Sequence, residues 1–291
     1  MPELPEVETV VRTLRPQVQG CRITAVDVLR ERSLHPSGLP PETLVGLGIG
    51  AVRRRGKLAL LELEAPAAAC AAAAPDAGQG GPRPSLLAVH LRMTGRFMVH
   101  AEGSAPLRHT RIIFHLRRPD GTGAQLFFDD VRAFGLVFIA TPELLDGWDF
   151  WRSLGPEPLE MRPADLGPRL RGRRAVKALL LDQTVLAGVG NIYADESLFR
   201  AGIDPRRPAQ SLTAAEAESL CLALQDVLRE SIAQCGSSIR DYRDANGDVG
   251  AFQNSFFVYG RGGQACRRCG GRLEKHRVAG RGTVICPHCQ H

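Results

Sequence analysis

The chain has 291 residues, of which 44% are hydrophobic and 23% are charged, a composition typical of a globular protein long enough for two domains. Its formal net charge of +6 permits a nucleic-acid partner without requiring one. No apolar run approaches the length of a transmembrane helix, and the acidic, proline-containing start is not a signal peptide. We therefore expect a soluble, cytoplasmic protein with no membrane association.

The first predicted element is a helix at the N-terminus. Apolar residues recur with helical spacing between residues 7 and 14, and Pro16 is expected to end the segment. The ends of a chain are usually frayed. A helix with a buried face so close to the start therefore raises the question of what Pro2 and Glu3 do.

Seven short apolar runs follow, separated by turn residues. This pattern predicts an antiparallel β-sandwich or barrel. The segment 64–84, which interrupts the runs, is rich in alanine, glycine and proline, and we interpret it as a flexible insertion. The runs cover residues 23–28, 57–64, 85–93, 96–100, 110–116, 124–130 and 134–140.

Several side chains in or beside these runs are unusual for their position. Lys57 begins an apolar strand that could carry its ammonium group to a cleft, although most lone lysines are solvated surface charges. Met93 precedes Thr94-Gly95, which we interpret as a two-residue turn, so it would lie at a hairpin tip rather than in the core. Arg132 and Phe134 share one side of an extended segment. They are either packing residues or a wedge that enters a base stack.

From about residue 141 the pattern changes to a proline-rich segment followed by helices. Thr213 is the expected N-cap of the last helix. Gly188 and Gly190 precede the second helix, with Asn191 as its expected N-cap. Such a glycine turn exposes backbone N–H groups and is either a phosphate site or a simple joint between helices. The predicted helices cover residues 173–182, 191–201 and 213–234.

The strongest local signal is a pair of CxxC motifs near the C-terminus. Two such pairs at this separation present four thiolates to a tetrahedral Zn²⁺, and four sulfurs leave no open position for catalysis. Disulfides are the alternative, which a reducing cytosol disfavours, and His276 and His288 are weaker alternative ligands. Residues 261–291 hold seven Lys or Arg residues and one acidic residue. The rest of the chain has 30 basic and 30 acidic residues, so the whole formal surplus of positive charge lies in this tail. We predict a basic finger with one structural zinc bound by Cys266, Cys269, Cys286 and Cys289.

Together these motifs resemble the formamidopyrimidine-DNA glycosylase family, bacterial enzymes that excise oxidised purines. The similarity rests on PELPEVET, RRGK, HLRMTG, DxRxFG, GVGNIYADESLF and the four-cysteine finger, and it spans nearly the whole chain. It implies an α+β fold with an N-terminal antiparallel β-sandwich, a catalytic N-terminal helix, a helix–two-turn–helix domain and a β-hairpin zinc finger. The expected boundaries are 1–140 for the catalytic sandwich domain, 141–160 for a linker, 161–260 for the helical DNA-binding domain and 261–291 for the finger.

The resemblance also implies roles at matching positions. Pro2 would be the nucleophile, Glu3 the acid that assists opening of the sugar ring, and Glu6 a supporting carboxylate. Lys57 would belong to the catalytic group and grip phosphate. Residues 235–250 would form a flexible lesion-capping loop. The other phosphate contacts would be His90, Asn191 and Arg281, and the wedge that fills the hole in the duplex would be Met93, Arg132 and Phe134.

This role would answer the question raised by the first residues. Removal of Met1 gives Pro2 a free secondary amine, whose pKa near ~8 leaves far more neutral amine at pH 7 than a lysine with a pKa near ~10.4. Its attack on the sugar would give an iminium that is cationic at every pH and acts as an electron sink. Two departures from the family pattern are Ala133, where a second arginine is common, and the longer segment 64–84.

The implied function is that of a bifunctional DNA glycosylase/AP lyase of base excision repair. It would act as a monomer on double-stranded DNA that contains oxidised purines or abasic sites, and nick the strand by β,δ-elimination. Two alternatives stay open. One is an endonuclease VIII-like glycosylase for oxidised pyrimidines, and the other is a non-catalytic zinc-finger protein that binds damaged DNA.

Overall fold

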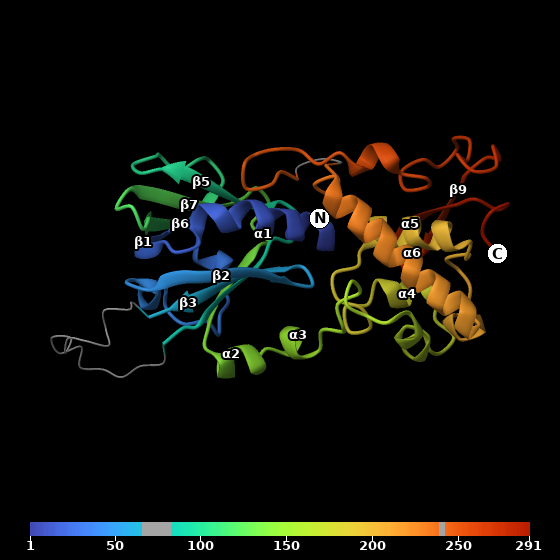
Figure 1. The fold of residues 1–291 in the computed structure, drawn as a ribbon, viewed down its shortest axis with the longest axis horizontal. Coiled ribbons are helices and arrows are strands. Elements are labelled where there is room, and N and C mark those ends of the chain that lie inside the picture. Colours follow the sequence, from blue (N-terminus) through green and yellow to red (C-terminus); the bar gives the residue numbers. More distant parts are fainter. Residues whose placement is uncertain (66–82, 239–241) are drawn as a thin grey trace. The chain divides into compact units, whose positions relative to one another are not determined.

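The computed structural model describes residues 1–65, 83–238 and 242–291, so most of the predicted insertion lies outside the described residues. Figure 1 shows the chain from its N-terminus to its C-terminus. It divides into two compact units, and none of the helices in the described ranges is long and apolar enough to cross a membrane. The first unit comprises Met1–Pro2, Glu6–Arg152 and Arg240–Val249, and the second comprises Glu3–Pro5, Ser153–Ile239 and Gly250–His291.

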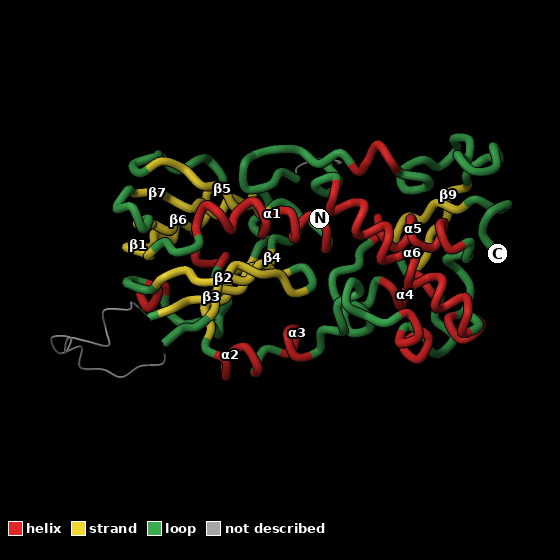
Figure 2. The backbone as a smooth tube through the Cα atoms, in the orientation of Figure 1, coloured by secondary structure: helices red, strands yellow, loops and turns green. Residues whose placement is uncertain are grey.

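The first unit is built on an antiparallel sheet with the strand order β5-β7-β6-β1-β2-β3-β4-β8, and Figure 2 shows its strands in yellow. β1 and β2 share one paired position, Arg22 opposite Gly48, and four strands lie on each side of it in this order. This confirms the predicted antiparallel β-rich domain. The strands are β1 Arg22–Val28, β2 Gly48–Arg55, β3 Leu58–Glu64, β4 Leu86–His90, β5 Gly95–Ala101, β6 Thr110–Arg117, β7 Gly123–Asp130 and β8 Leu136–Ala140.

Helix α1 (Leu4–Val18) packs its predicted apolar face into the core of this unit. The expectation that Pro16 ends the helix was wrong. A proline removes one helical hydrogen bond, but Val18 is fully buried and the Gln19 N–H donates to the Arg15 carbonyl at 3.0 Å. These interactions close the last turn beyond the proline.

Two features of the sheet differ from the sequence-based prediction. Strand β2 was missed, because its glycines and arginines hide the two buried residues Ile49 and Val52. The expected hairpin at Thr94-Gly95 is also wrong. β4 pairs with β3 and β8, whereas β5 pairs with β7, and Gly95 is the first residue of β5. The turn before Gly95 therefore connects strands from opposite halves of the sheet order.

The segment after β8 folds back onto the sheet of the first unit through aromatic contacts. The Trp148 ring lies 5.2 Å from Phe138 of β8 and 5.1 Å from Phe150, and the Phe150 ring lies 5.8 Å from His90 of β4. These centroid distances are typical of packed aromatic pairs. The short helices of this part of the chain are α2 (Pro142–Asp146) and α3 (Asp149–Arg152), and two 3₁₀ helices, η1 (Glu31–Ser33) and η2 (Pro41–Leu44), precede β2.

The second unit is helical and confirms the three predicted helices, the first in shortened form. α6 begins with a complete capping box, in which Thr213 and Glu216 exchange side-chain and backbone hydrogen bonds. The cysteine-rich tail adds a two-stranded hairpin. The elements are η4 Pro163–Asp165, η5 Gly167–Arg169, α4 Val176–Leu180, α5 Asn191–Ala201, η6 Ala209–Ser211, α6 Ala214–Ala233, η7 Phe252–Ser255, β9 Glu274–Val278 and β10 Arg281–Ile285.

The loop predicted to cap a lesion is described apart from residues 239–241. Its later part belongs to the first unit and rests on α1. There, Ala245 is 2% exposed and donates its N–H to Thr13 Oγ1 at 3.1 Å, and the Tyr242 hydroxyl donates to the Glu6 carbonyl at 3.2 Å. This part of the loop is thus anchored on the helix that follows Pro2.

Candidate functional site

Glu3 lies at the N-terminal end of α5, within the second unit. Its side chain is 4% exposed, and Oε1 accepts a hydrogen bond from the Ile192 N–H at 3.2 Å. The next residue, Leu4, donates its N–H to the Gly188 carbonyl at 3.0 Å. The first N–H groups of a helix lack partners within it and carry the positive end of its dipole. A carboxyl group near the chain terminus is therefore held in one place by a distant helix.

The two glycines before α5 allow this approach. Gly188 has a φ of +87°, and a Cβ there would lie 2.8 Å from Leu4 Cβ. Gly190 has ordinary extended backbone, but a Cβ would overlap the Glu3 carboxyl group, 2.6 Å from Oε2. The expectation that Asn191 caps α5 was wrong, because Gly190 occupies the N-cap position and offers no side chain. Glu3 supplies the capping oxygen instead.

Pro2 and Glu6 belong to the first unit, on either side of the start of α1. Pro2 is buried, while Met1 before it is 52% exposed. Glu6 is 2% exposed in the first turn of the helix. The start of the chain is thus buried from its second residue.

Lys57 lies in the turn between β2 and β3 and is 6% exposed. Arg55 pairs with Leu58 across the hairpin, so Gly56 and Lys57 form its two-residue connection, with a φ of +56° at Gly56. Lys57 therefore precedes the strand rather than beginning it. Arg54 braces this turn by donating from Nη1 to the Gly56 carbonyl at 3.0 Å.

Arg54 also ties the Lys57 turn to α1. Its Nε donates to Glu8 Oε2 at 3.1 Å, and its side chain is 7% exposed. Burial alone would raise the pKa of Glu8, but hydrogen bonds and charges from Arg12 and Arg54 lower it below its usual value. Glu8 is thus an anionic anchor, and the turn that carries Lys57 is fixed to the helix that follows Pro2.

His90 ends β4 as a buried, neutral imidazole. Burial, with smaller effects from the charges of Arg92 and Lys57, lowers its pKa to about 3. Its Nδ1 accepts a hydrogen bond from the Arg92 N–H at 3.0 Å. A neutral imidazole carries one proton, so that proton is on Nε2. His90 can therefore donate one hydrogen bond from Nε2 without contributing a positive charge.

The structure brings Met93, Arg132 and Phe134 together on the surface of the first unit, and we call these three residues the wedge. The Arg132 guanidinium lies 4.9 Å from the Phe134 ring centre, and its Nη1 approaches Met93 Sδ at 2.9 Å. Met93 is 41% exposed and Phe134 is 48% exposed. Neither Met93 nor Phe134 is therefore a core residue, which excludes core packing, one of the two interpretations that the sequence left open for them.

Asn191 and Arg281 lie at adjoining parts of the second unit. Asn191 Nδ2 donates to the Gly282 carbonyl at 3.0 Å, next to Arg281 at the start of β10. Arg281 itself is exposed. The turn between β9 and β10 has positive φ at Ala279 and Gly280, as a tight two-residue hairpin turn requires. The first residue of α5 and the finger hairpin thus form one local surface.

Sequence reasoning missed a buried ion pair beneath this surface. Lys177 of α4 is fully buried and lies 2.6 Å from Asp195 of α5, and its Nζ also donates to Thr283 Oγ1 at 2.7 Å. Burial lowers the pKa of Lys177 and raises the pKa of Asp195 to about 6. The one available signal was a lysine within an apolar helical run in a chain that has only three lysines.

The four predicted zinc ligands converge at the end of the finger. Their Sγ atoms all lie within 4.8 Å of one another, with Cys266–Cys289 at 4.0 Å and Cys269–Cys286 at 3.5 Å. Tetrahedral Zn–S bonds of about 2.3 Å place sulfurs about 3.8 Å apart. This geometry fits one structural Zn²⁺, bound by thiolates alone.

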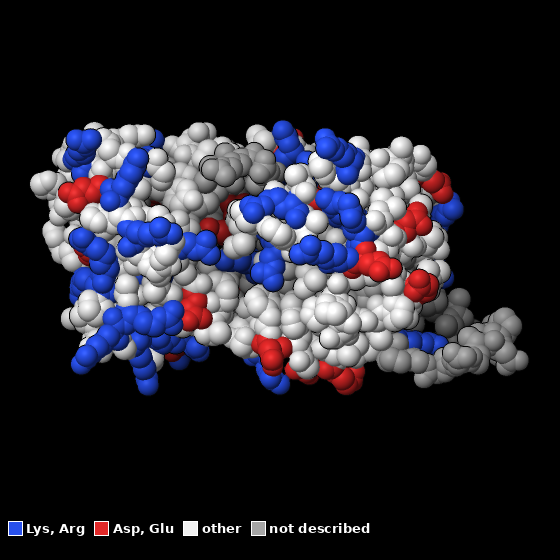
Figure 3. All heavy atoms as spheres, turned by 180° about the vertical axis from the view of Figure 1, so that it is seen from behind, with Lys and Arg blue, Asp and Glu red and all other residues white. Residues whose placement is uncertain are grey.

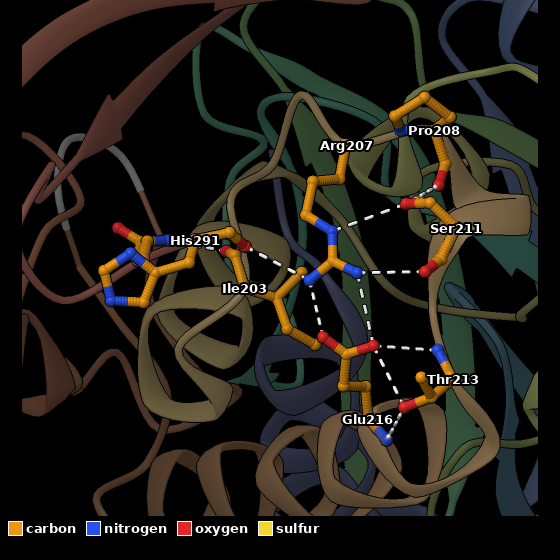
Figure 4. A network of polar contacts seen from close by, with 8 residues as sticks. Ile203, Arg207, Pro208, Ser211, Thr213, Glu216 and His291 are labelled. Atoms are coloured by element: carbon orange, nitrogen blue, oxygen red, sulfur yellow. Dashed lines mark hydrogen bonds and ion pairs between the residues drawn. The ribbon is translucent and has the colours of Figure 1, made fainter.

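The finger is fixed to the helices of the same unit by its last residues. Arg207 donates to both carboxylate oxygens of Glu216, at 2.6 and 3.2 Å, and to the His291 carbonyl at 3.2 Å (Figure 4). Hydrogen bonds from Arg207 and Thr213 lower the pKa of Glu216 to about 2. Gln290 adds a bond from Nε2 to the Ile203 carbonyl at 3.0 Å. The metal site is thereby held against the helical part of the unit.

Basic side chains are spread over the face of the molecule drawn in Figure 3, with fewer acidic ones between them. The finger alone contributes seven of the 37 Lys and Arg residues. Such a distribution favours a polyanionic partner.

Comparison with known proteins gives a consistent result along the whole chain. Residues 1–137 match the family model "Formamidopyrimidine-DNA glycosylase N-terminal domain", residues 154–243 match "Formamidopyrimidine-DNA glycosylase H2TH domain", and residues 263–291 match "Zinc finger found in FPG and IleRS". The formamidopyrimidine-DNA glycosylases of Nitratidesulfovibrio vulgaris and Desulfitobacterium hafniense are 45% and 44% identical, with all of each chain covered.

Solved structures agree with these matches. The Lactococcus lactis Fpg in complex with abasic-site DNA gives a TM-score of 0.84 at 31% identity, over 99% of both chains. The MutM (Fpg) protein of Thermus thermophilus gives 0.80 at 40% identity, over 99% of this chain and 98% of that one. A Lactococcus lactis mutant in complex with Fapy-dG DNA gives 0.83 at 31% identity, over the full length of both.

Proposed function

Because the chain belongs to the formamidopyrimidine-DNA glycosylase family, and is therefore a DNA glycosylase of base excision repair, we propose that it excises oxidised purines from duplex DNA and then cleaves the strand. Its substrates would be 8-oxoguanine, formamidopyrimidines and abasic sites. The observation that carries the proposal is the ordered start of the chain, where Glu3 is held by α5 next to Pro2.

The proposed nucleophile is the nitrogen of Pro2. It requires removal of Met1, because a nitrogen acylated by Met1 is an amide and cannot attack. The freed secondary amine has a pKa near ~8, so roughly a tenth is neutral at pH 7. It forms a bond to C1′ of the sugar while the bond from C1′ to the base breaks. The base leaves with the electron pair of that bond and takes up the proton that the amine nitrogen loses. Glu3 donates a proton to the ring oxygen as the ring opens.

The covalent product accounts for the proposed lyase activity. The iminium nitrogen withdraws electrons from C1′, so a proton is lost from C2′ and the 3′ phosphate departs. A second elimination releases the 5′ phosphate, and hydrolysis then frees the amine. Both steps are eliminations and need no oxidant or reductant. Glu6, buried in the first turn of α1, is the proposed supporting carboxylate.

We assign contacts with the substrate DNA to residues of both units. Lys57 supplies a charge and neutral His90 a hydrogen bond from Nε2, while Asn191 and Arg281 supply contacts from the second unit. Extrusion of a base costs a few kcal/mol, and the exposed wedge is suited to fill the vacated space. Zinc stiffens the finger that carries Arg281 and takes part in no chemical step.

The domain assignment belongs to the same proposal, with catalysis in residues 1–140, a linker at 141–160, DNA binding in 161–260 and the finger in 261–291. We propose a monomer that acts on chromosomal DNA in the cytoplasm. Light scattering during gel filtration tests the oligomeric state.

Borohydride trapping with duplex oligonucleotides tests the proposal. The protein should form a covalent adduct with DNA that carries 8-oxoguanine or an abasic site, and should excise 8-oxoguanine faster than thymine glycol. Faster excision of thymine glycol would favour the endonuclease VIII-like activity. Absence of any adduct with abasic DNA would refute the Schiff-base mechanism.

A further inference from the structure

Two separate loops carry the wedge. Met93 lies in the turn between β4 and β5, and Arg132 and Phe134 lie in the loop between β7 and β8. Both loops are exposed, and Ala133 adopts a φ of +53°, a conformation that residues other than glycine rarely adopt. A wedge of this kind needs a device that fixes the two loops to each other.

Asp130, the last residue of β7, lies beneath both loops and is fully buried. Its Oδ1 accepts the hydroxyl of Thr94, which follows Met93 in the other loop. The same carboxylate accepts the Arg132 N–H at 3.2 Å and the Gly135 N–H at 2.6 Å. One carboxylate thus accepts hydrogen bonds from Arg132 and Gly135, which flank Ala133 and Phe134, and from Thr94, which follows Met93.

Two further contacts complete this arrangement. Thr94 Oγ1 accepts the Arg132 N–H at 3.0 Å while its own proton goes to Asp130. Arg111 of β6, 8% exposed, donates from Nε to the Asp130 carbonyl at 2.7 Å. We call Thr94, Arg111 and Asp130 the clasp. A Cβ at Gly135 would lie 2.5 Å from Phe128 Cζ and 3.0 Å from Asp130 Oδ2, so the loop can approach Asp130 this closely only without a side chain there.

We propose that Asp130 and Thr94 are positioning residues of the base-extrusion step. They touch neither the sugar nor the base. They hold the wedge assembled before DNA arrives, so that little ordering is needed when it enters the stack. The proposal rests on the proposed function, because it assigns the clasp to the step that precedes base excision.

Thr94→Val tests this directly, since valine keeps the shape of threonine and removes the hydroxyl. Asp130→Asn keeps the shape of the carboxylate but places an NH₂ group opposite an N–H donor. A buried donor or acceptor that loses its partner weakens the arrangement. The measured quantity is the ratio of two single-turnover rates. One is excision of 8-oxoguanine from a paired duplex, and the other is cleavage of a preformed abasic site, where no base is extruded.

We expect both variants to lower this ratio about tenfold, and Thr94→Ser, which keeps the hydroxyl, to stay within about twofold of the wild type. Thr110→Val is the matched control. Thr110 is a second threonine whose hydroxyl donates to a buried aspartate, Asp129, at 2.6 Å, and it is buried where Thr94 is half-buried. It makes none of the clasp contacts, so its ratio should not change.

Repeating the measurement in the Phe134→Ala protein distinguishes positioning of the wedge from a general contribution of Thr94 to the structure. The Phe134→Ala protein already lacks one side chain of the wedge. Adding Thr94→Val to it should therefore lower the ratio of the two rates by less than about twofold. Equal loss of both rates, or full additivity with Phe134→Ala, would overturn the proposal. If Asp130→Asn fails to fold, Thr94→Val carries the test. If the wild type excises only an oxidised pyrimidine, the proposed substrate is wrong, and the same ratio measured on that lesion tests the clasp.

Discussion

Gly190→Ala should disable base excision, and should do so only by displacing the Glu3 carboxyl group. Gly190 has a φ of −134° and a ψ of −163°, which alanine adopts without strain. Backbone strain would therefore not cause the loss of activity. The added Cβ would lie 2.6 Å from Glu3 Oε2, about 1 Å short of ordinary contact. Displacement of a reacting group by that distance costs about 100-fold in rate. Overpacking costs about 1–3 kcal/mol, which a protein of ordinary stability survives.

Single-turnover excision of 8-oxoguanine should therefore fall about 100-fold in Gly190→Ala, while a borohydride-trapped adduct with abasic DNA should persist. A preformed abasic site exists partly as an aldehyde, with which an amine condenses without an acid to open the ring. Glu3→Gln should show the same pattern, and adding Gly190→Ala to it should cause little further loss.

Gly167→Ala is the matched control for this experiment. Gly167 lies in the same unit, and a Cβ there would meet Ala217 Cβ at 3.5 Å, an ordinary contact. This variant should excise at the wild-type rate. Near-wild-type excision by Gly190→Ala would show that the position of the Glu3 carboxyl group is not needed, and would refute the assignment of Glu3 as the acid.

Four further predictions concern the proposed nucleophile, His90 and Arg281. A tag that blocks the nitrogen of Pro2 should abolish borohydride trapping while Lys57→Ala retains it, and the reverse result would make Lys57 the nucleophile. Neutral His90 should contribute equally to DNA affinity at about pH 5.5 and pH 8, as the ratio of wild-type to His90→Gln affinities measures. Because its folded pKa is depressed, its contribution to stability is complete above pH ~6.5 and should decline as the pH falls toward about 3, which urea unfolding measures. Arg281→Ala should reduce the slope of log affinity against log salt by about 0.9. Arg162→Ala is the control, because Arg162 is an exposed arginine distant from Arg281 in the sequence, and it should leave the slope unchanged.

The features that sequence reasoning predicted are those fixed by local spacing. The four cysteines fall in two short motifs, so their convergence follows from one hairpin. The capping box of α6 joins Thr213 and Glu216, three residues apart. Met93 and Phe134 were placed at turns because Thr94-Gly95 follows the first and Gly135 follows the second. In these cases the interacting groups lie close in the sequence or follow a regular period.

The missed features depend on contacts between distant segments. The Glu3 carboxyl group caps a helix 189 positions further along the chain, and nothing in the local pattern shows that Gly190 must lack a side chain. Lys177 and Asp195 are separated by a turn of irregular backbone, so their pairing depends on how α4 and α5 pack. His90 was expected only as a phosphate contact, and its burial in the folded protein is what shows that it is neutral.

If the nucleophile is the nitrogen of Pro2, as proposed, a fixed position of the first residues is a requirement of the reaction. Fixing a residue costs about 1–2 kcal/mol in backbone entropy, and a terminus has no preceding chain to share the restraint. Here the Leu4 N–H bond to Gly188, the Glu3 bond to Ile192 and the burial of the apolar face of α1 offset that cost. A lysine side chain would need none of these contacts, but it would offer several hundred times less neutral amine at pH 7. The ordered N-terminus is therefore a condition for using the more reactive amine.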